Sequence, residues 1–255
     1  MRVPESEDAF VVFGDQDSGC LSYGVEVDGR RWFVKRPRTP AAAASLARAL
    51  GLHAAVRHAA IVRPEIVLDG ADGPVLVYPW QAGTVLNHAT VHGPDRMGLA
   101  RFQTLPLPEA RAALATVLDA HVAVAAAGYV AVDLYDGCLL YDFDAHRMRL
   151  VDLDEYRPQP FLLASDRLPG SRRYLAPEGF TRGARIDHRT TVFALGRVLH
   201  HLLDSPGGWR GTADERAVVH RATRPDPDDR YPDPAALTRA WAEQEQAAAA
   251  DPWRG

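Results

Sequence analysis

The stretch LSYGVEVDGRRWFVK, residues 21–35, has two runs of alternating apolar and polar side chains on either side of Asp28-Gly29. An Asp-Gly pair between two such runs predicts a β-hairpin, because both central residues of the tight turn need positive φ angles. The second run ends at Lys35, the only lysine among the 29 Lys and Arg residues of the chain. A compact ammonium is kept here in a protein that otherwise uses planar guanidinium groups, so we expect Lys35 to have a specific ligand.

The rest of the first ninety residues is also mostly typical of strands. Residues 9–14 form a short apolar run that ends at Gly14, and the turn from Gly70 to Gly73 separates two further apolar runs. Between these strands, Thr39-Pro40 opens an Ala-rich helix with proline in its first turn, and Gly51 is its predicted stop. The sequence therefore predicts a β-rich region over about residues 1–79.

After Pro94 the pattern becomes helical. Residues 107–128 predict one long buried helix and residues 189–204 another, because apolar side chains recur at the helical period. A loop-rich stretch between them contains two short strand signals, at 138–143 and 148–153. We expect a single α+β domain with a small β-rich N-lobe (about 1–79), a connection (about 78–83) and a larger helical C-lobe (about 84–245).

Composition narrows the class of protein. The chain has 255 residues, of which 47% are apolar, enough for the core of one large domain or two small lobes. The net charge of −4, without an acidic or basic tail, argues against nucleic acid and anionic membranes as partners. The two cysteines form no CxxC motif, and there is no signal-peptide pattern and no apolar run of about 18 residues. We expect a soluble, cytoplasmic protein.

Two groups of residues could carry chemistry. Gly14 and Gly19 lie in a loop before the hairpin, where backbone N–H groups could contact phosphates, although hairpin turns also use glycines. Asp133 precedes a short predicted strand, where a carboxylate can accept a proton from a hydroxyl. Asp152 and Asp154 follow another short strand, and carboxylate oxygens on a tight loop suit Mg²⁺. Taken singly, aspartates in loops are ordinary turn chemistry.

A third stretch, PGSRRYLAPEGF at 169–180, connects these features. With it, the chain resembles the eukaryotic-like Ser/Thr protein kinases of bacteria over roughly residues 10–241. The APE motif of that family is present at 176–178. The segments DHRTTVFALG and DPDDRYPDPAAL, at 187–196 and 226–237, are similar to the family's buried helix and closing segment.

The resemblance implies a bilobal protein-kinase-like fold that binds ATP and Mg²⁺ between the lobes. Lys35 matches the strand lysine that holds the nucleotide phosphates, and Asp133 matches the catalytic-loop aspartate. Asp152 matches the metal-binding aspartate of the DFG motif. The resemblance also implies a buried ion pair between Glu178 and Arg230.

The same resemblance gives the glycine loop and the connection between the lobes a part in nucleotide binding. Gly14 and Gly19 would lie near the phosphates. Val77 would be the gatekeeper, and Tyr78 and Trp80 would offer a backbone C=O and N–H to adenine.

Several family positions are changed. The helix position that normally carries the glutamate partner of Lys35 is Ala49, and the helix position that is normally aspartate is Thr191. Ala131 and Val132 precede Asp133 in place of His and Arg, and Tyr135 stands where the family has lysine.

The metal-binding asparagine of the family is Cys138 in this chain, and a thiol is a poor ligand for hard Mg²⁺. We expect Asp154 to supply the missing oxygen beside Asp152, with Cys138 as a spectator. Alternatively, Asp154 pairs with a nearby arginine such as Arg157 or Arg172. Asp136 is a weaker candidate for the metal.

The predicted function is transfer of the γ-phosphoryl group of Mg-ATP to a hydroxyl, most readily a Ser or Thr of a protein. The APE segment favours a protein substrate, because small-molecule kinases of this superfamily generally lack it. Two alternatives stay open: a pseudokinase that acts as a binding or scaffolding module, and a small-molecule kinase of a biosynthetic or resistance pathway.

Overall fold

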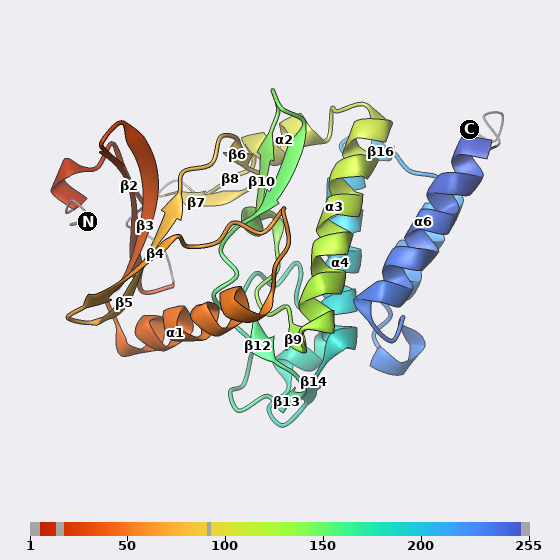
Figure 1. Cartoon of the computed structure of the whole chain (residues 1–255). Coiled ribbons are helices and arrows are strands. Elements are labelled where there is room, and N and C mark those ends of the chain that lie inside the picture. The colour runs from red at the N-terminus through yellow and green to blue at the C-terminus, as the bar shows by residue number, and fades with distance from the viewer. Residues whose placement is uncertain (1–5, 14–17, 91–92, 251–255) are drawn as a thin grey trace.

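The structure, a computed structural model, describes residues 6–13, 18–90 and 93–250. Its architecture is mixed α+β: an antiparallel five-stranded sheet with one helix comes first, and a more helical region follows (Figure 1). The sheet has the order β1-β2-β3-β5-β4, with the strands β1 (Val11–Phe13), β2 (Cys20–Val27), β3 (Arg30–Pro37), β4 (Ile66–Gly70) and β5 (Gly73–Pro79).

The predicted hairpin is confirmed as β2 and β3. Asp28 and Gly29 have φ angles of 52° and 74°, as a tight turn between twisted strands requires. Because side chains alternate along each strand, the sheet has two apolar faces. One face gathers Tyr23, Val34 and Val77, and the other packs Leu76 and Tyr78 against the helix α1 (Pro40–Ala55).

Helix α1 begins where the sequence predicted but ends later. The Thr39 side chain accepts a hydrogen bond from the Ala42 N–H at 3.1 Å, which caps the first turn. The predicted stop at Gly51 is wrong, because the helix continues to Ala55. A glycine in a helix costs about 1 kcal/mol relative to alanine, whereas burying Leu52 completely contributes roughly 1.5–3 kcal/mol.

The helical region has its core between α3 (Leu107–Ala126), α4 (His188–Leu203) and α6 (Pro234–Ala250), which lie together in Figure 1. Leu114, Leu195 and Trp241 are among its fully buried side chains. Helices α3 and α4 were predicted. Two shorter helices were not: α2 (Met97–Phe102) and α5 (Ala213–Ala222). Within the described ranges, no helix combines the length and the apolar character that a membrane crossing demands.

Short strand pairs and 3₁₀ turns make up the rest of this region. The pairs are β7 (His88–Thr90) with β8 (Gly93–Asp95), β9 (Tyr129–Val130) with β12 (Arg157–Pro158), β13 (Phe161–Leu162) with β14 (Arg185–Ile186), and β15 (Asp204–Ser205) with β16 (Gly208–Trp209). The 3₁₀ turns are η1 (Ser6–Asp8), η2 (Asp136–Cys138), η3 (Pro177–Phe180) and η4 (Pro227–Asp229).

One small sheet joins the two regions and positions the site. The two predicted short strands are confirmed as the hairpin β10 (Leu139–Asp142) and β11 (Arg147–Leu150), with β6 (Thr84–Val85) on its edge. The Leu150 N–H donates to the Ala60 C=O at 2.8 Å, and the Val62 N–H donates to the Leu150 C=O at 3.0 Å. These bonds hold the end of β11 against the chain between α1 and β4, so the loop after β11 reaches β3.

Candidate functional site

Lys35 of β3 meets Asp152 and Asp154 of the loop after β11. The Lys35 ammonium contacts Asp152 Oδ1 and Asp154 Oδ2 in a double ion pair. Lys35 and Asp154 are almost fully buried, whereas the Asp152 side chain is 40% exposed. One lysine thus joins the N-terminal sheet to the loop that follows β11.

The charges in this cluster are unbalanced, since two carboxylates face one ammonium. Burial opposes the charge on Lys35, but Asp152 and Asp154 together raise its pKa well above the usual range. Burial raises the pKa of Asp154, although the Lys35 charge acts in the opposite direction. Lys35 is therefore held as a cation. Of its two carboxylate partners, Asp154 is the more buried, so burial disfavours its charged form more.

Lys35 has its second carboxylate partner in Asp154, and not in helix α1. Ala49 is fully buried and carries no charge, so Lys35 has no partner at that position. Asp154 Oδ2 contacts Lys35 instead, and neither Arg157 nor Arg172 pairs with it among the described residues. Asp154 Oδ1 is buried and has no hydrogen-bond partner within the described part of the chain.

A magnesium ion would find only part of its ligand set in the protein. Over the described residues, no group of three or more His, Cys, Asp or Glu side chains could hold a metal by itself. Mg²⁺ is usually held by one or two carboxylates together with substrate phosphates. Asp152, with an exposed carboxylate, and Asp154, with its unpartnered Oδ1, provide oxygens of the right kind.

Asp133 lies close enough to this cluster for its charges to affect the pKa of the Asp133 carboxyl. Burial raises the pKa of Asp133 to about 7, with a further contribution from Asp152 and Glu155 and an opposing one from Lys35. Both Asp133 and Asp152 have left-handed backbone conformations, with φ angles of 62° and 59°. Such conformations are unfavourable for residues other than glycine and concentrate at functional sites.

The segment before the APE motif covers Asp133. A Cβ atom at Gly170 would lie 2.5 Å from Asp133 Oδ1, and only a cavity of about 10 Å³ remains between Asp133, Ser171 and Tyr174. Asp133 Oδ1 is buried without a hydrogen-bond partner among the described residues. A carboxyl with a pKa near 7 beside two other carboxylates has the protonation behaviour of a general base.

The raised pKa of Asp133 makes stability depend on pH. Its folded pKa exceeds the usual value of 3.8, so its stabilising contribution is complete below that value and is lost as pH rises through about 7. Asp133→Asn is therefore expected to raise the free energy of unfolding relative to wild type at pH 8, by about 2–4 kcal/mol, and much less at pH 5. Urea unfolding at both pH values measures this difference. The exposed control Asp144→Asn should show no such pH dependence, and an equal response of the two variants would contradict the assignment.

Cys138 lies between the two strained aspartates. Its thiol donates to the Asp133 C=O at 3.2 Å and contacts the Asp152 C=O at 3.8 Å. Burial raises the pKa of Cys138 well above its usual value, so the thiol stays protonated and able to donate. Cys138 therefore connects the backbones of the two loops.

Thr191 connects α4 to the segment that precedes Asp133. Its hydroxyl oxygen accepts a hydrogen bond from the Ala131 N–H at 2.9 Å, and both groups are buried. A shorter side chain thus still ties α4 to the loop that carries Asp133.

Asp136 does not reach the carboxylate cluster. It is fully buried, accepts a hydrogen bond from the Asn87 side chain at 2.8 Å, and lies 3.6 Å from the Arg173 guanidinium. The Asp136 side chain thus connects the β6–β7 loop to the segment before the APE motif, which does not favour the suggestion that it binds a metal.

Helix α1 contacts the loop after β11 through Glu155, a residue that the sequence analysis did not single out. Ser45 donates a hydrogen bond to Glu155, and the Arg48 guanidinium lies 3.2 Å from the same carboxylate. Arg157 contacts it from the other side at 3.1 Å. The carboxylate of Glu155 thus comes from the loop after β11, and one of its two guanidinium partners, that of Arg48, comes from α1.

The predicted gatekeeper lies on the wrong face of β5. Val77 pairs with Val34 and packs in the cluster on the outer face of the sheet. Leu76 lies directly opposite Lys35, so Tyr78, two residues further, has its side chain on the Lys35 face. Burial raises the pKa of Tyr78 well above its usual value, and the charge of Asp154 acts in the same direction.

The Tyr78 and Trp80 backbone groups, which were predicted to bind adenine, face β3 instead. The Trp80 N–H donates to the Arg31 C=O at 3.1 Å. Hydrogen-bonded pairs alternate in an antiparallel ladder, so the Tyr78 backbone also faces β3, opposite Phe33. On the opposite edge of β5, the Pro79 C=O accepts a hydrogen bond from the Gln81 side chain at 3.1 Å.

Gly14 and Gly19 were predicted to lie near the nucleotide phosphates. Gly14 lies outside the described residues. Gly19 has a φ angle of 68°, and a Cβ atom there would lie 2.7 Å from the Thr39 hydroxyl that caps α1. The structure thus explains Gly19 by its turn and by its close approach to the cap.

The predicted ion pair between Glu178 and Arg230 is confirmed. Two parallel hydrogen bonds of 2.8 and 2.9 Å join the guanidinium to the carboxylate, and the Arg230 side chain is fully buried. This pair connects the end of the APE motif to the segment before α6.

No protein-family model matches the chain. No curated protein matches it significantly either.

Proposed function

We propose that this protein is a protein-kinase-like phosphotransferase that transfers the γ-phosphoryl group of Mg-ATP to a hydroxyl, most readily a Ser or Thr of a cytoplasmic protein. The observation that carries the proposal is the convergence of Lys35, Asp133 and Asp152 from three separate segments of the chain. The finer description of the fold, with a small lobe up to about residue 79 and a large lobe after residue 84, belongs to the same proposal.

Each residue has a role that follows from its charge and exposure. Lys35 is a buried cation, suited to neutralise the charge of the nucleotide phosphates. Asp133, with a pKa of about 7, accepts the proton of the attacking hydroxyl. Bound Mg²⁺ would neutralise phosphate charge, with Asp152 and the free oxygen of Asp154 as its protein ligands.

The register of β3 and β5 supports different base contacts from those predicted. The Pro79 C=O and the Gln81 N–H take the place of Tyr78 and Trp80, and Tyr78 takes the place of Val77 as gatekeeper. Proline suits the first of these positions, because only its carbonyl would be used.

One observation favours a second candidate, a kinase-like binding module without catalysis. The rings of Phe33 and Tyr78 lie 6.2 Å apart on the Lys35 face of the sheet, and Phe13 lies 6.0 Å from Phe33. Phe33 is two residues before Lys35 in β3, so both side chains lie on the same face of the sheet, and Phe33 is on the side where the base of a nucleotide would lie. These aromatic rings would exclude a purine unless Phe33 moves.

Nucleotide binding separates the two candidates. If the phosphotransferase proposal holds, Mg-ATP at about 100 times its Kd should stabilise the protein by roughly 2.7 kcal/mol. Differential scanning fluorimetry with Mg-ATP, Mg²⁺ alone, and ATP with EDTA measures the shift. The double variant Lys35→Met/Asp154→Asn, which removes the ion pair from both sides, should lose most of it. If the wild-type protein shows no shift, phosphotransfer from ATP is rejected and the binding module is favoured.

A further inference from the structure

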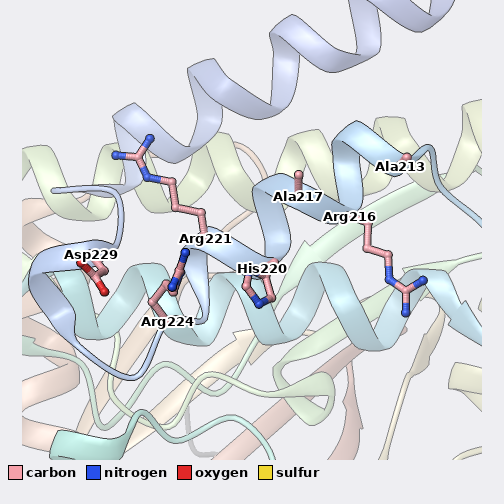
Figure 2. Close-up of a pocket in the computed structure, with 7 residues that line it drawn as sticks. All are labelled: Ala213, Arg216, Ala217, His220, Arg221, Arg224 and Asp229. Carbon is pink, nitrogen blue, oxygen red and sulfur yellow. The ribbon is translucent and has the colours of Figure 1, made fainter.

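A hollow of about 540 Å³ lies on the exposed side of α5, far along the chain from the carboxylate cluster. Figure 2 shows the residues that line it, and we call it the α5 groove. Helix α5 supplies Ala213, Arg216, Ala217, His220 and Arg221; Arg224 lies two residues beyond the end of the helix, and Asp229 lines one end.

The opposite side of α5 is firmly packed. Val218, Val219 and Ala222 are buried, and a Cβ atom at Gly196 of α4 would lie 2.8 Å from the Ala222 Cβ. Glu215 is fully buried and pairs with Arg111 of α3 at 2.7 Å. The helix is therefore fixed to α3 and α4, and the α5 groove is a preformed surface.

The arginines of the α5 groove lack acidic partners. Among the described residues, neither Arg216 nor Arg224 takes part in an ion pair, and Arg221 lies 4.3 Å above the ring of Tyr231. Elsewhere some exposed arginines, such as Arg30 and Arg182, pair with carboxylates, whereas others, such as Arg57 and Arg147, have no ion pair among the described residues. The arginines of the α5 groove differ from these in lining one hollow together.

In the segment after α5, Asp226 and Asp228 are engaged elsewhere, whereas Asp229 lines the α5 groove. Asp228 lies 3.6 Å from the Arg189 guanidinium, and Asp226 accepts a hydrogen bond from the Asp228 N–H. Basic side chains in the last turn of a helix are favoured by its dipole, which accounts for His220 and Arg221. The dipole explains neither Arg216 nor the hollow beside Ala213 and Ala217.

The basic side chains are spread along the α5 groove, which indicates an elongated ligand. From Arg216 to Ala222, the last residue of α5, the helix advances about 9 Å along its axis, and Arg224 lies two residues beyond that end. Figure 2 shows the Arg216 guanidinium at one end of the α5 groove, and His220, Arg221 and Arg224 toward the other. A single small anion could contact only one of these ends. An extended peptide advances about 6.7 Å every two residues, so alternate acidic side chains could reach both ends.

We propose that the α5 groove binds an extended, acidic segment of a partner protein. Guanidinium groups bind carboxylates through two parallel hydrogen bonds, which gives each arginine a directional contact as well as a charge. The net charge of the whole protein is negative, so this surface would attract such a segment locally and not through the overall field.

The test uses a fluorescein-labelled decapeptide of alternating Glu and Gly, titrated with the full chain and followed by fluorescence anisotropy at 150 mM salt. We expect saturable binding, and Arg216→Gln/Arg224→Gln should weaken it at least tenfold. The matched pair Arg57→Gln/Arg147→Gln removes the same charge from exposed positions elsewhere and should change the Kd less than twofold.

Three results would overturn the proposal. These are no binding at 150 mM salt, equal weakening by the control pair, or complete displacement of the peptide by 1 mM inorganic phosphate, which would indicate a small-anion site. Circular dichroism of each variant checks that it is folded. No nucleotide is present, so the outcome is independent of whether the protein transfers phosphate.

Discussion

Arg230→Ala is expected to lower the free energy of unfolding by about 3–5 kcal/mol, because it leaves the Glu178 carboxylate without its buried partner. The guanidinium also donates to the backbone carbonyls of Arg224, Arg189 and Pro225 at 2.7–3.0 Å. One side chain thus holds together three segments of the helical region: η3, the start of α4 and the connection between α5 and α6. Urea unfolding followed by circular dichroism measures the loss.

The control for this prediction is Arg182→Ala. Arg182 also pairs with a carboxylate, that of Asp166, but the two side chains are 65% and 88% exposed. Exposed ion pairs contribute about 0–1 kcal/mol, so this variant should stay close to wild type. Equal losses in the two variants would show that the Glu178 pair does not have the importance that its burial indicates.

Lys35→Met is expected to cost a similar amount, again about 3–5 kcal/mol at neutral pH, since Asp154 is then buried beside Asp152 with no cation. The loss should shrink at low pH. Without the lysine the pKa of Asp154 would rise further, and protonation would remove the uncompensated charge.

A double-variant cycle tests the origin of this effect. Lys35→Met/Asp154→Asn should recover most of the stability lost in Lys35→Met, because the amide is neutral. If the double variant is no more stable than Lys35→Met at neutral pH, the cost does not come from the Asp154 carboxylate.

The parts of the fold that could be predicted are those with strong local signals. The hairpin β2–β3 has Asp-Gly at its turn, and α3 and α4 have long apolar periodicity. Helix α5 was missed because charged residues dominate it, and its buried Glu215 does not read as a core position. A signal was present, since Thr212 and Glu215 form a capping box.

Lys35, Asp133 and Asp152 were chosen from their places in loops and strands and from the resemblance to kinases. The structure brings the three residues together, and their roles stay predictions. The assignments to Val77 and Tyr78 failed for a simple reason. A shift of one residue along a strand moves every side chain to the other face, and the sequence does not reveal the register between β3 and β5.

Asp154 illustrates a different limit. Its spacing from Asp152 was recognised, but whether it would turn toward a metal, an arginine or Lys35 depends on how the loop after β11 folds. The contact of Glu155 with Ser45 and Arg48 joins residues more than 100 positions apart. Such a pairing has no local signal at all.

The two cysteines have a practical consequence for studying motions of the native protein. Cys20 begins β2 in the N-terminal sheet and Cys138 lies between the two strained aspartates, and both thiols are free and buried. A thiol reagent can react with either only during a transient opening of its surroundings, so each modification rate reports the free energy of that opening. Single replacement of either cysteine would assign the rates. The natural sequence thus already allows the sheet and the loop that carries Asp133 to be compared for local opening, without any introduced probe.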